Sequence, residues 1–194
     1  MAGKAEYRSA RRSRRLIREA FLKLLEQKDY NKISVTDIVT LADINRATFY
    51  AHYPDVRGLL EEIENEIIGA MKEILSRLEY HAFFANPAPL LLEVSRYLEN
   101  DEAFYRTLIR SNGADPFLEK LKQVFTQFML EDTNIPQELR GSREFRLRVC
   151  FFAGGIANIY RQYFWGQLDC SLSDISVEVG RMVAAFSKEA VNGG

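Results

Sequence analysis

The sequence ISVTDIVTLADINRATFYAHYPDVRGLL, residues 33–60, decides how the rest of the chain is interpreted. Ser34 stands before an apolar run with Asp37 three residues later, a spacing typical of a capped helix start. This pattern predicts a short helix of about two turns after Ser34. Asn45 is a second N-cap residue, and it predicts another short helix over residues 46–53.

The helix that precedes this stretch carries one apolar stripe and, away from it, a set of arginines. The apolar residues recur at helical spacing: Ile17, Ala20, Phe21, Leu24 and Leu25. Arg11, Arg15 and Arg18 fall outside this stripe, so we expect them to face solvent or phosphate. Three helices packed through apolar residues, with a short turn between the second and third, predict a helix-turn-helix over about residues 33–52. The packing residues are expected to be Phe21, Leu24, Ile38 and Phe49.

Charge is divided unevenly along the chain. Residues 1–53 carry 11 basic and 6 acidic side chains, whereas the remainder carries 15 basic and 21 acidic ones. A basic N-terminal part on an acidic body indicates a polyanion as partner of the first part alone. A solvated, arginine-rich helix start explains the same charges, and charge alone does not separate these two interpretations.

The helix over residues 46–53 supplies the candidate DNA-reading surface. Arg46 can donate two hydrogen bonds to guanine, and the methyl groups of Ala47 and Thr48 can meet a thymine methyl. Candidate phosphate contacts are hydroxyl, imidazole and guanidinium groups around that helix: Ser34, Thr36, Tyr50, His52, Arg11 and Arg15. An ordinary solvated surface explains any one of these residues. Their convergence within 53 residues favours binding to double-stranded DNA.

Residues 33–60 resemble the DNA-binding region of the TetR/AcrR family of transcriptional regulators. The resemblance covers about residues 10–70 and depends on the run TFYAHY, residues 48–53, after the turn ADIN, residues 42–45. It implies that the third helix reads bases while Ser34, Thr36, Tyr50 and His52 hold the DNA backbone. We also count Asn45, at the start of that helix, among the DNA-binding residues.

Two positions depart from the family pattern. The turn usually carries glycine where this chain has Asp43, but Asp tolerates a left-handed backbone better than most residues. A lysine that touches phosphate commonly begins the fourth helix, where this chain has Val56. Arg57 stands next to it and is a candidate substitute in an offset register.

We predict an all-α fold of about nine helices, because apolar residues recur at helical spacing and no stretch alternates like a strand. The N-terminal helix-turn-helix domain is expected over residues 10–70 and a helical ligand-sensing and dimerisation domain over residues 71–194. Further helices are predicted over residues 55–80, 90–100, 101–111, 115–131, 143–166 and 173–190. Residues 1–9 and 193–194 are expected to be disordered.

The resemblance implies an apolar pocket in the body for a small apolar or aromatic effector. Phe104, Tyr105 and Phe125 are candidate walls of this pocket, and Asn158 and Gln162 are candidate orienting groups. Core packing explains most of the body's aromatic residues equally well.

The last two predicted helices are candidates for the interface of a homodimer. The helix around residues 151–165 is apolar on more than one side, so it needs a partner surface. The expected interface residues are Gly154, Ala157, Trp165, Val179, Val183 and Phe186. A symmetric dimer reads a palindromic operator. A repressor released by its effector is the favoured function, and a regulator or activator controlled by a protein partner is the alternative.

Other function classes find little support in the sequence. Only His52 and His81 are present, and no nucleophile–base pair, metal-ligand spacing or phosphate loop is visible, so we expect neither an enzyme nor a cofactor or metal. The longest apolar run, residues 149–160, is too short to cross a bilayer. We therefore expect a protein of the cytoplasm with no membrane partner, and the family resemblance implies a bacterial source.

Overall fold

The computed structural model describes residues 2–77, 83, 86–111, 114–131 and 135–192. Within these residues the chain is all-α, as predicted, with ten α-helices, one 3-10 helix and no strand. The elements are α1 (Ala2–Gln27), η1 (Tyr30–Lys32), α2 (Val35–Ala42), α3 (Arg46–Tyr50), α4 (Val56–Ser76), α6 (Ala88–Glu99), α7 (Glu102–Arg110), α8 (Ala114–Glu131), α9 (Gln137–Gly141), α10 (Arg143–Phe164) and α11 (Leu172–Asn192).

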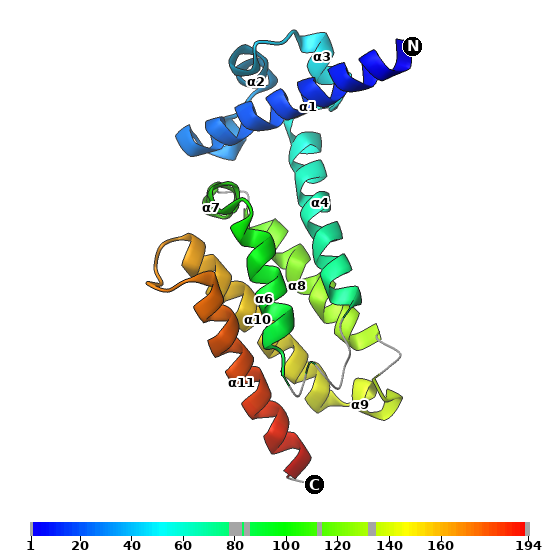
Figure 1. The fold of residues 1–194 in the computed structure, drawn as a ribbon, viewed down its shortest axis with the longest axis vertical. Helices are drawn as coiled ribbons and strands as arrows, with labels where there is room; N and C mark the ends of the chain where they lie inside the picture. The colour runs from blue at the N-terminus through cyan, green and yellow to red at the C-terminus, as the bar shows by residue number, and fades with distance from the viewer. Residues whose placement is uncertain (1, 78–82, 84–85, 112–113, 132–134, 193–194) are drawn as a thin grey trace.

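The N-terminal head consists of α1, α2 and α3, which lie together at one end of the elongated molecule (Figure 1). Phe21, Ile38 and Phe49, one from each helix, are fully buried, and Leu24 is 8% exposed. These are the four residues that the apolar spacing predicted for the head core. Their burial removes a continuous apolar surface from water, which is the main favourable contribution to packing three short helices.

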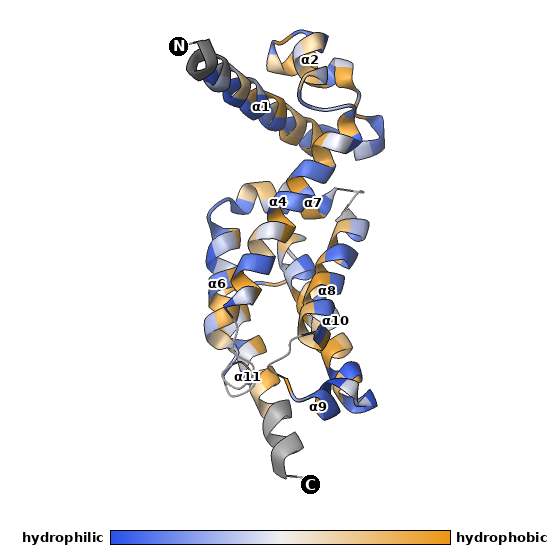
Figure 2. Ribbon diagram, turned by 90° about the vertical axis from the view of Figure 1, so that its right-hand side faces the viewer, coloured by the Kyte–Doolittle hydropathy of each residue, from blue (hydrophilic) through white to orange (hydrophobic). Residues whose placement is uncertain are grey.

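Helix α4 runs from the head into the body (Figure 1). Its first turns bury Leu59 and Ile63, and its last turns bury Ile74 and Leu75 on the side that packs against α6 and α8. Figure 2 shows the alternation of polar and apolar faces along the helices of the head and body. One helix therefore contributes to the packing of both parts of the molecule.

A buried carboxylate lies midway along α4. Glu64 is 4% exposed, and its Oε2 accepts a hydrogen bond at 2.5 Å from Nζ of Lys120 on α8. A buried charge without a partner is costly, so Lys120 offsets the burial of Glu64 only where α4 and α8 are in register. The Lys120 side chain is 46% exposed, so this ion pair adds to the apolar packing that holds α4 on the body.

The body is built from α6, α7, α8, α10 and α11. Helix α6 packs along α11, and a Cβ added at Gly180 would lie 3.1 Å from Cβ of Ala88. The two helices can approach this closely because residue 180 has no side chain. Among the described helices, none combines the length and apolar character that a bilayer-spanning segment requires.

Three hydroxyl groups form a buried network inside the body. Ser95 Oγ lies 2.7 Å from Ser176 Oγ and 3.1 Å from the hydroxyl of Tyr160. Ser95 also donates to the carbonyl of Leu172, and Ser176 donates to the carbonyl of Leu91, each at 3.0 Å. Every polar group of the network has a partner, so it joins α6, α10 and α11 without an unsatisfied hydroxyl.

Several predicted boundaries were wrong. Helix α1 begins at Ala2, although residues 1–9 were expected to be disordered. Helix α3 ends at Tyr50 rather than near residue 53, and the five-residue α9 was not predicted, because a single turn is too short for apolar periodicity. Helix α4 is described as far as Ser76, and the rest of its predicted range, residues 78–80, lies outside the described residues.

Replacing Lys120 with Met tests the buried ion pair. We expect the free energy of unfolding to fall by about 1–3 kcal/mol, because the Glu64 carboxylate stays buried without its cation. The double variant Glu64→Gln/Lys120→Met is expected to recover most of this loss. Urea unfolding followed by circular dichroism measures both, with Lys72→Met on the exposed side of α4 as the matched control. Equal losses in Lys120→Met and Lys72→Met would contradict the interpretation.

Candidate nucleic-acid interface

The start of α2 is held by a reciprocal cap. Ser34 Oγ accepts from the backbone N–H of Asp37 at 3.2 Å, while Asp37 Oδ2 accepts from the Ser34 N–H at 2.8 Å. The Ser34 hydroxyl also donates to Asp37 Oδ2 at 2.7 Å. This is the capping box that the spacing of these residues predicted. Because Asp37 engages both donors of Ser34, a phosphate contact by Ser34 stays a prediction that requires them to change partner.

Asp37 also connects α2 to the end of α1. Lys28 Nζ lies 2.8 Å from Asp37 Oδ2. The hydrogen bonds from Lys28 and Ser34 hold the pKa of the Asp37 carboxyl well below its ordinary value of 3.8. The carboxylate is therefore charged at neutral pH, and it stabilises the N-terminal end of α2.

The turn between α2 and α3 depends on one left-handed residue. Asp43 has φ 51° and ψ 50°, and it is the one non-glycine residue with positive φ in the described part of the chain. The prediction that Asp preserves this turn in place of glycine is confirmed. Its backbone geometry lets the N–H of Ile44 reach the carbonyl of Val39 at 3.1 Å and sets the angle between the two helices.

Helix α3 turns one face to the core and another to solvent. Asn45 Oδ1 accepts from the N–H of Thr48 at 2.7 Å and from its hydroxyl at 3.0 Å, so Asn45 acts as the N-cap. Arg46 and Ala47 are exposed, Thr48 is half-buried and Tyr50 is 53% exposed. The residues predicted to read bases thus lie at the solvent-facing start of α3.

A contact between the two helices places Arg46. Its Nη2 donates a hydrogen bond to Oγ1 of Thr36, in the first turn of α2. The first N–H groups of α2 have no carbonyl within their own helix to bond, and this end of the helix carries a partial positive charge. Arg46, the Thr36 hydroxyl and the first N–H groups of α2 therefore lie on one surface, next to the Asp37 carboxylate that caps this helix.

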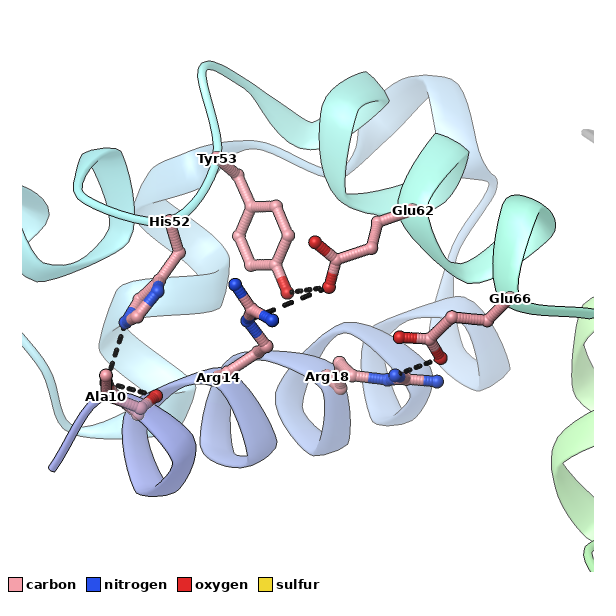
Figure 3. A network of polar contacts seen from close by, with 8 residues as sticks. Ala10, Arg14, Arg18, His52, Tyr53, Glu62 and Glu66 are labelled. Atoms are coloured by element: carbon pink, nitrogen blue, oxygen red, sulfur yellow. Dashed lines mark hydrogen bonds and ion pairs between the residues drawn. The ribbon is translucent and has the colours of Figure 1, made fainter. Parts of the chain in front are cut away.

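His52 links the end of the motif to α1. Its Nε2 lies 2.8 Å from Oγ of Ser13, and its ring is half-buried (Figure 3). This contact supports the position of α3 on α1. A phosphate contact by His52 stays a prediction. Because Nε2 contacts Ser13, Nδ1 is the ring nitrogen left for such a contact.

A second set of polar contacts joins α1 to the start of α4 (Figure 3). The hydroxyl of Tyr53 donates to Glu62 Oε1 at 2.9 Å, and Arg14 Nε lies 3.8 Å from the same oxygen. Arg18 donates to Glu66 at 2.5 Å. Burial and the neighbouring Glu62 carboxylate raise the pKa of Tyr53, so its hydroxyl remains a proton donor. These contacts hold the head against α4.

Further basic groups follow the exposed side of α1. Arg8, Arg11, Arg12 and Arg15 line a shallow groove along this helix. Arg11 lies over the ring of Tyr7 at 5.9 Å, and Arg15 makes a 3.6 Å ion pair with Glu19 while its side chain stays 70% exposed. Both arginines predicted to face phosphate are therefore solvent-accessible.

The start of α4 places Arg57, rather than residue 56, in solvent. Val56 is half-buried, whereas the Arg57 side chain is 79% exposed and pairs with Glu61 at 2.8 Å. Asp55 caps the helix by accepting from the N–H of Gly58 at 2.7 Å. Arg57 is thus an accessible cation beside the commonly basic position, and its contact with DNA stays a prediction.

The candidate ligand-binding residues do not all line the same cavity. Tyr105 and Phe125 line one cavity in the body, with Ala153, Tyr160 and Phe164 of α10. Phe104 instead lines a groove beside the arginines of α1, and Asn158 lines a shallow groove with Asp115 and Arg161. Gln162 is half-buried and is not among the residues that line the cavity. Phe104, Asn158 and Gln162 thus do not line this cavity, and their predicted contact with a ligand stays a prediction that its walls do not support.

The helical period explains this separation on α10. Positions 153, 157, 160 and 164 fall on one side of a helix of 3.6 residues per turn, and positions 158 and 162 fall on the opposite side. The sequence alone did not show which side faces the cavity.

The candidate dimer residues also fall into two groups, one partly exposed and one buried. Gly154 and Ala157 are half-buried and Trp165 is 44% exposed, but Val179 and Val183 are 5% and 1% exposed. The assignment of both valines to a subunit interface was wrong, because they lie on the side of α11 that is buried in the body. The side chain of Phe186 lies outside the described residues.

Sequence reasoning missed the most exposed apolar residues of the last two helices. Leu147 and Phe151 of α10 are 61% and 66% exposed, and Val177 and Met182 of α11 are 36% and 54% exposed. Leu147 and Phe151 occupy the same side of α10 as Trp165, so the helical period was a signal that could have identified them.

Asp37 gives a pH dependence of stability with a defined sign. A folded-state pKa below the ordinary value of 3.8 means that the charged carboxylate stabilises the head above this pH. This contribution is lost as the pH falls through the lowered folded-state pKa, because unfolding then takes up a proton. We expect Asp37→Asn to take up as much as about one proton fewer on unfolding than the parent protein. The slope of the free energy of unfolding against pH, measured by urea unfolding across this acid range, reports this difference. Asp169→Asn, in the exposed loop after α10, should keep the slope of the parent protein, and an unchanged slope in Asp37→Asn would contradict the prediction.

Most of the chain matches known protein families. Residues 17–63 match the family described as "Bacterial regulatory proteins, tetR family", and residues 85–184 match "Transcriptional regulator C-terminal region". The HTH-type dhaKLM operon transcriptional activator DhaS of Lactococcus lactis subsp. lactis (strain IL1403) is 32% identical over 97 residues, 50% of this chain and 48% of that protein. The uncharacterized HTH-type transcriptional regulator YxbF of Bacillus subtilis (strain 168) is 43% identical over 51 residues, 26% of this chain and 13% of that protein. The matches thus span about half or less of the length of these relatives.

The fold is also found in a solved structure. The TetR transcriptional regulator from Streptococcus agalactiae 2603V has a TM-score of 0.58 and 21% identity, over 93% of this chain and 98% of that one. The helical body is therefore shared along with the head.

Proposed function

Because the chain belongs to the TetR family of bacterial regulatory proteins and is a DNA-binding transcriptional regulator, we propose that it represses transcription as an effector-released homodimer. The observation that carries the proposal is the surface made by the exposed start of α3 and the N-terminus of α2. There Arg46 is held by Thr36 beside Ala47 and Tyr50. In this arrangement α3 enters the major groove, and helix termini and arginines meet the phosphates on either side.

A dimer is proposed from the exposed apolar side chains of the last two helices. Leu147, Phe151, Val177 and Met182 are exposed in one subunit, and a symmetric copy would cover them. Two α3 helices would then reach successive major grooves about 34–36 Å apart, which matches a palindromic operator.

Release by an effector is proposed from the position of the body cavity. Ile67, Met71 and Leu75 of α4 form part of its wall, and Glu62 and Glu66 of the same helix pair with Arg14 and Arg18 of α1. A ligand that favours one placement of α4 would shift the population of dimers whose α3 helices match the operator.

An activator, or a regulator controlled by a protein partner, is the second candidate. The relative DhaS is named as an operon activator, and it is 32% identical over half of this chain. A reporter gene behind the operator separates the two: deletion of the regulator raises expression under repression and lowers it under activation.

Substitution of Arg46 tests the DNA-reading surface. Arg46→Gln should weaken binding to the operator sequence by about 5–150-fold, since one bidentate base contact contributes about 1–3 kcal/mol of discrimination. Fluorescence anisotropy on the DNA upstream of the regulator's own gene measures the affinity, and Arg96→Gln, on the exposed side of α6 in the body, is the matched control. Arg15→Gln should instead reduce the salt dependence by about one phosphate contact. Undiminished specific binding in Arg46→Gln would refute this surface as the reader.

Leu147→Glu tests the proposed dimer. A buried, unpaired carboxylate at the interface should convert the dimer to monomers in analytical ultracentrifugation and abolish preference for a full palindrome over a half-site. Leu139→Glu makes the same change on α9, where the side chain is 37% exposed, and should leave the dimer intact. A dimer that withstands Leu147→Glu but not Leu139→Glu would place the interface elsewhere.

A further inference from the structure

We propose that the body cavity takes a small, uncharged hydrocarbon-like ligand of about the size of a benzene ring. This inference rests on the effector-released function proposed above, and it narrows that function to one chemical class. Charged and strongly polar molecules of similar size are excluded from the class by the walls of the cavity.

Among the described residues, every side chain that lines the cavity is apolar or aromatic except Lys122 at its rim. Helix α4 contributes Met71 and Leu75, helix α8 contributes Leu121 and Phe125, and α10 contributes Ala153 and Phe164. The cavity volume is about 160 Å³. An engineered apolar cavity of about 150 Å³ in another protein stays dry and binds benzene, so this size and lining suit a single small ring or a short alkyl chain.

The hydroxyl groups of the two wall tyrosines offer no charge to a ligand. The hydroxyl of Tyr160 lies 3.1 Å from Ser95 Oγ, and either atom can be the donor. Ser95 and its neighbour Ser176 are not among the residues that line the cavity, so this contact directs the Tyr160 hydroxyl into the buried network. Burial, followed by the neighbouring Tyr97, raises the pKa of Tyr105, so its hydroxyl stays uncharged.

One cationic residue borders the cavity. Lys122 pairs with Glu119 on the same helix, and it also lines two shallower grooves between α8 and α10. Lys122 therefore marks the rim where the cavity approaches the surface. Its ammonium group is already paired with the Glu119 carboxylate. A ligand carboxylate would have to displace Glu119, and a ligand ammonium would meet no carboxylate among the described residues of the cavity wall.

The affinity order of three probes follows from these walls. An occupant that fills an apolar cavity stabilises the folded state, since the empty cavity is unfavourable. Toluene should therefore raise the melting temperature of the full-length protein in a saturable way. Benzoate and benzylamine should bind at least about 10-fold more weakly, because the charged group is buried without a partner. Thermal unfolding and isothermal titration calorimetry measure the order.

Variants locate the site. Leu121→Trp fills the cavity and should abolish the toluene response, whereas Leu139→Trp on exposed α9 should retain it. If Leu121→Trp does not fold, Ala153→Leu fills the same cavity with a smaller change and takes its place. A toluene response that persists in the filled variants, a preference for benzoate or benzylamine, or no response to toluene would each overturn the inference.

A parallel titration with operator DNA separates this inference from the proposed function. Toluene binding without loss of DNA affinity supports the ligand class and refutes release by that ligand. Specific DNA binding in a protein that does not respond to toluene overturns the ligand class and leaves the DNA-binding function standing.

Discussion

The structure depends on the sharing of α4 between two packed units. Leu59 and Ile63 are buried where the helix passes the head, and Ile74 and Leu75 are buried against the body. Between these turns, Glu64 is buried and requires Lys120 of α8 as its partner. A continuous helix transmits displacement along its axis, so the position of the head follows from how α4 lies on α8 and α6. In the proposed function, a ligand in the cavity beside α4 acts on the head through this constraint.

Several polar residues of the head form hydrogen bonds within the protein and stabilise its structure. Ser34 and Asn45 cap α2 and α3, and His52 bonds to Ser13 of α1. A cap fixes the orientation of a short helix that could not form alone, because isolated helices of this length are unstable in water. The surface that we propose for DNA contact therefore has fewer residues than the set of polar side chains in the head: Arg46, Ala47 and Tyr50, with the arginines of α1 beside them.

Helix α10 shows why a helical pattern alone is ambiguous in the body. Its apolar residues occupy more than one side: Ala153, Tyr160 and Phe164 face the cavity, whereas Leu147 and Phe151 face solvent in the single subunit. Both sets have helical spacing, so periodicity predicts the helix but does not say which side meets the core. Asn158 and Gln162 follow the second side for the same geometric reason.

Local sequence patterns were enough to predict the all-α fold, the two capped short helices, the left-handed Asp43 and the head core of Phe21, Ile38 and Phe49. These features depend on residues close in the chain, where spacing and backbone preference act directly. Long-range packing, in contrast, buries Val179 and Val183 against the body, pairs Glu64 with Lys120, and gives the cavity a wall whose described residues are apolar except Lys122. Each of these depends on which helices meet and through which side, and contacts between distant segments leave no local pattern in the sequence.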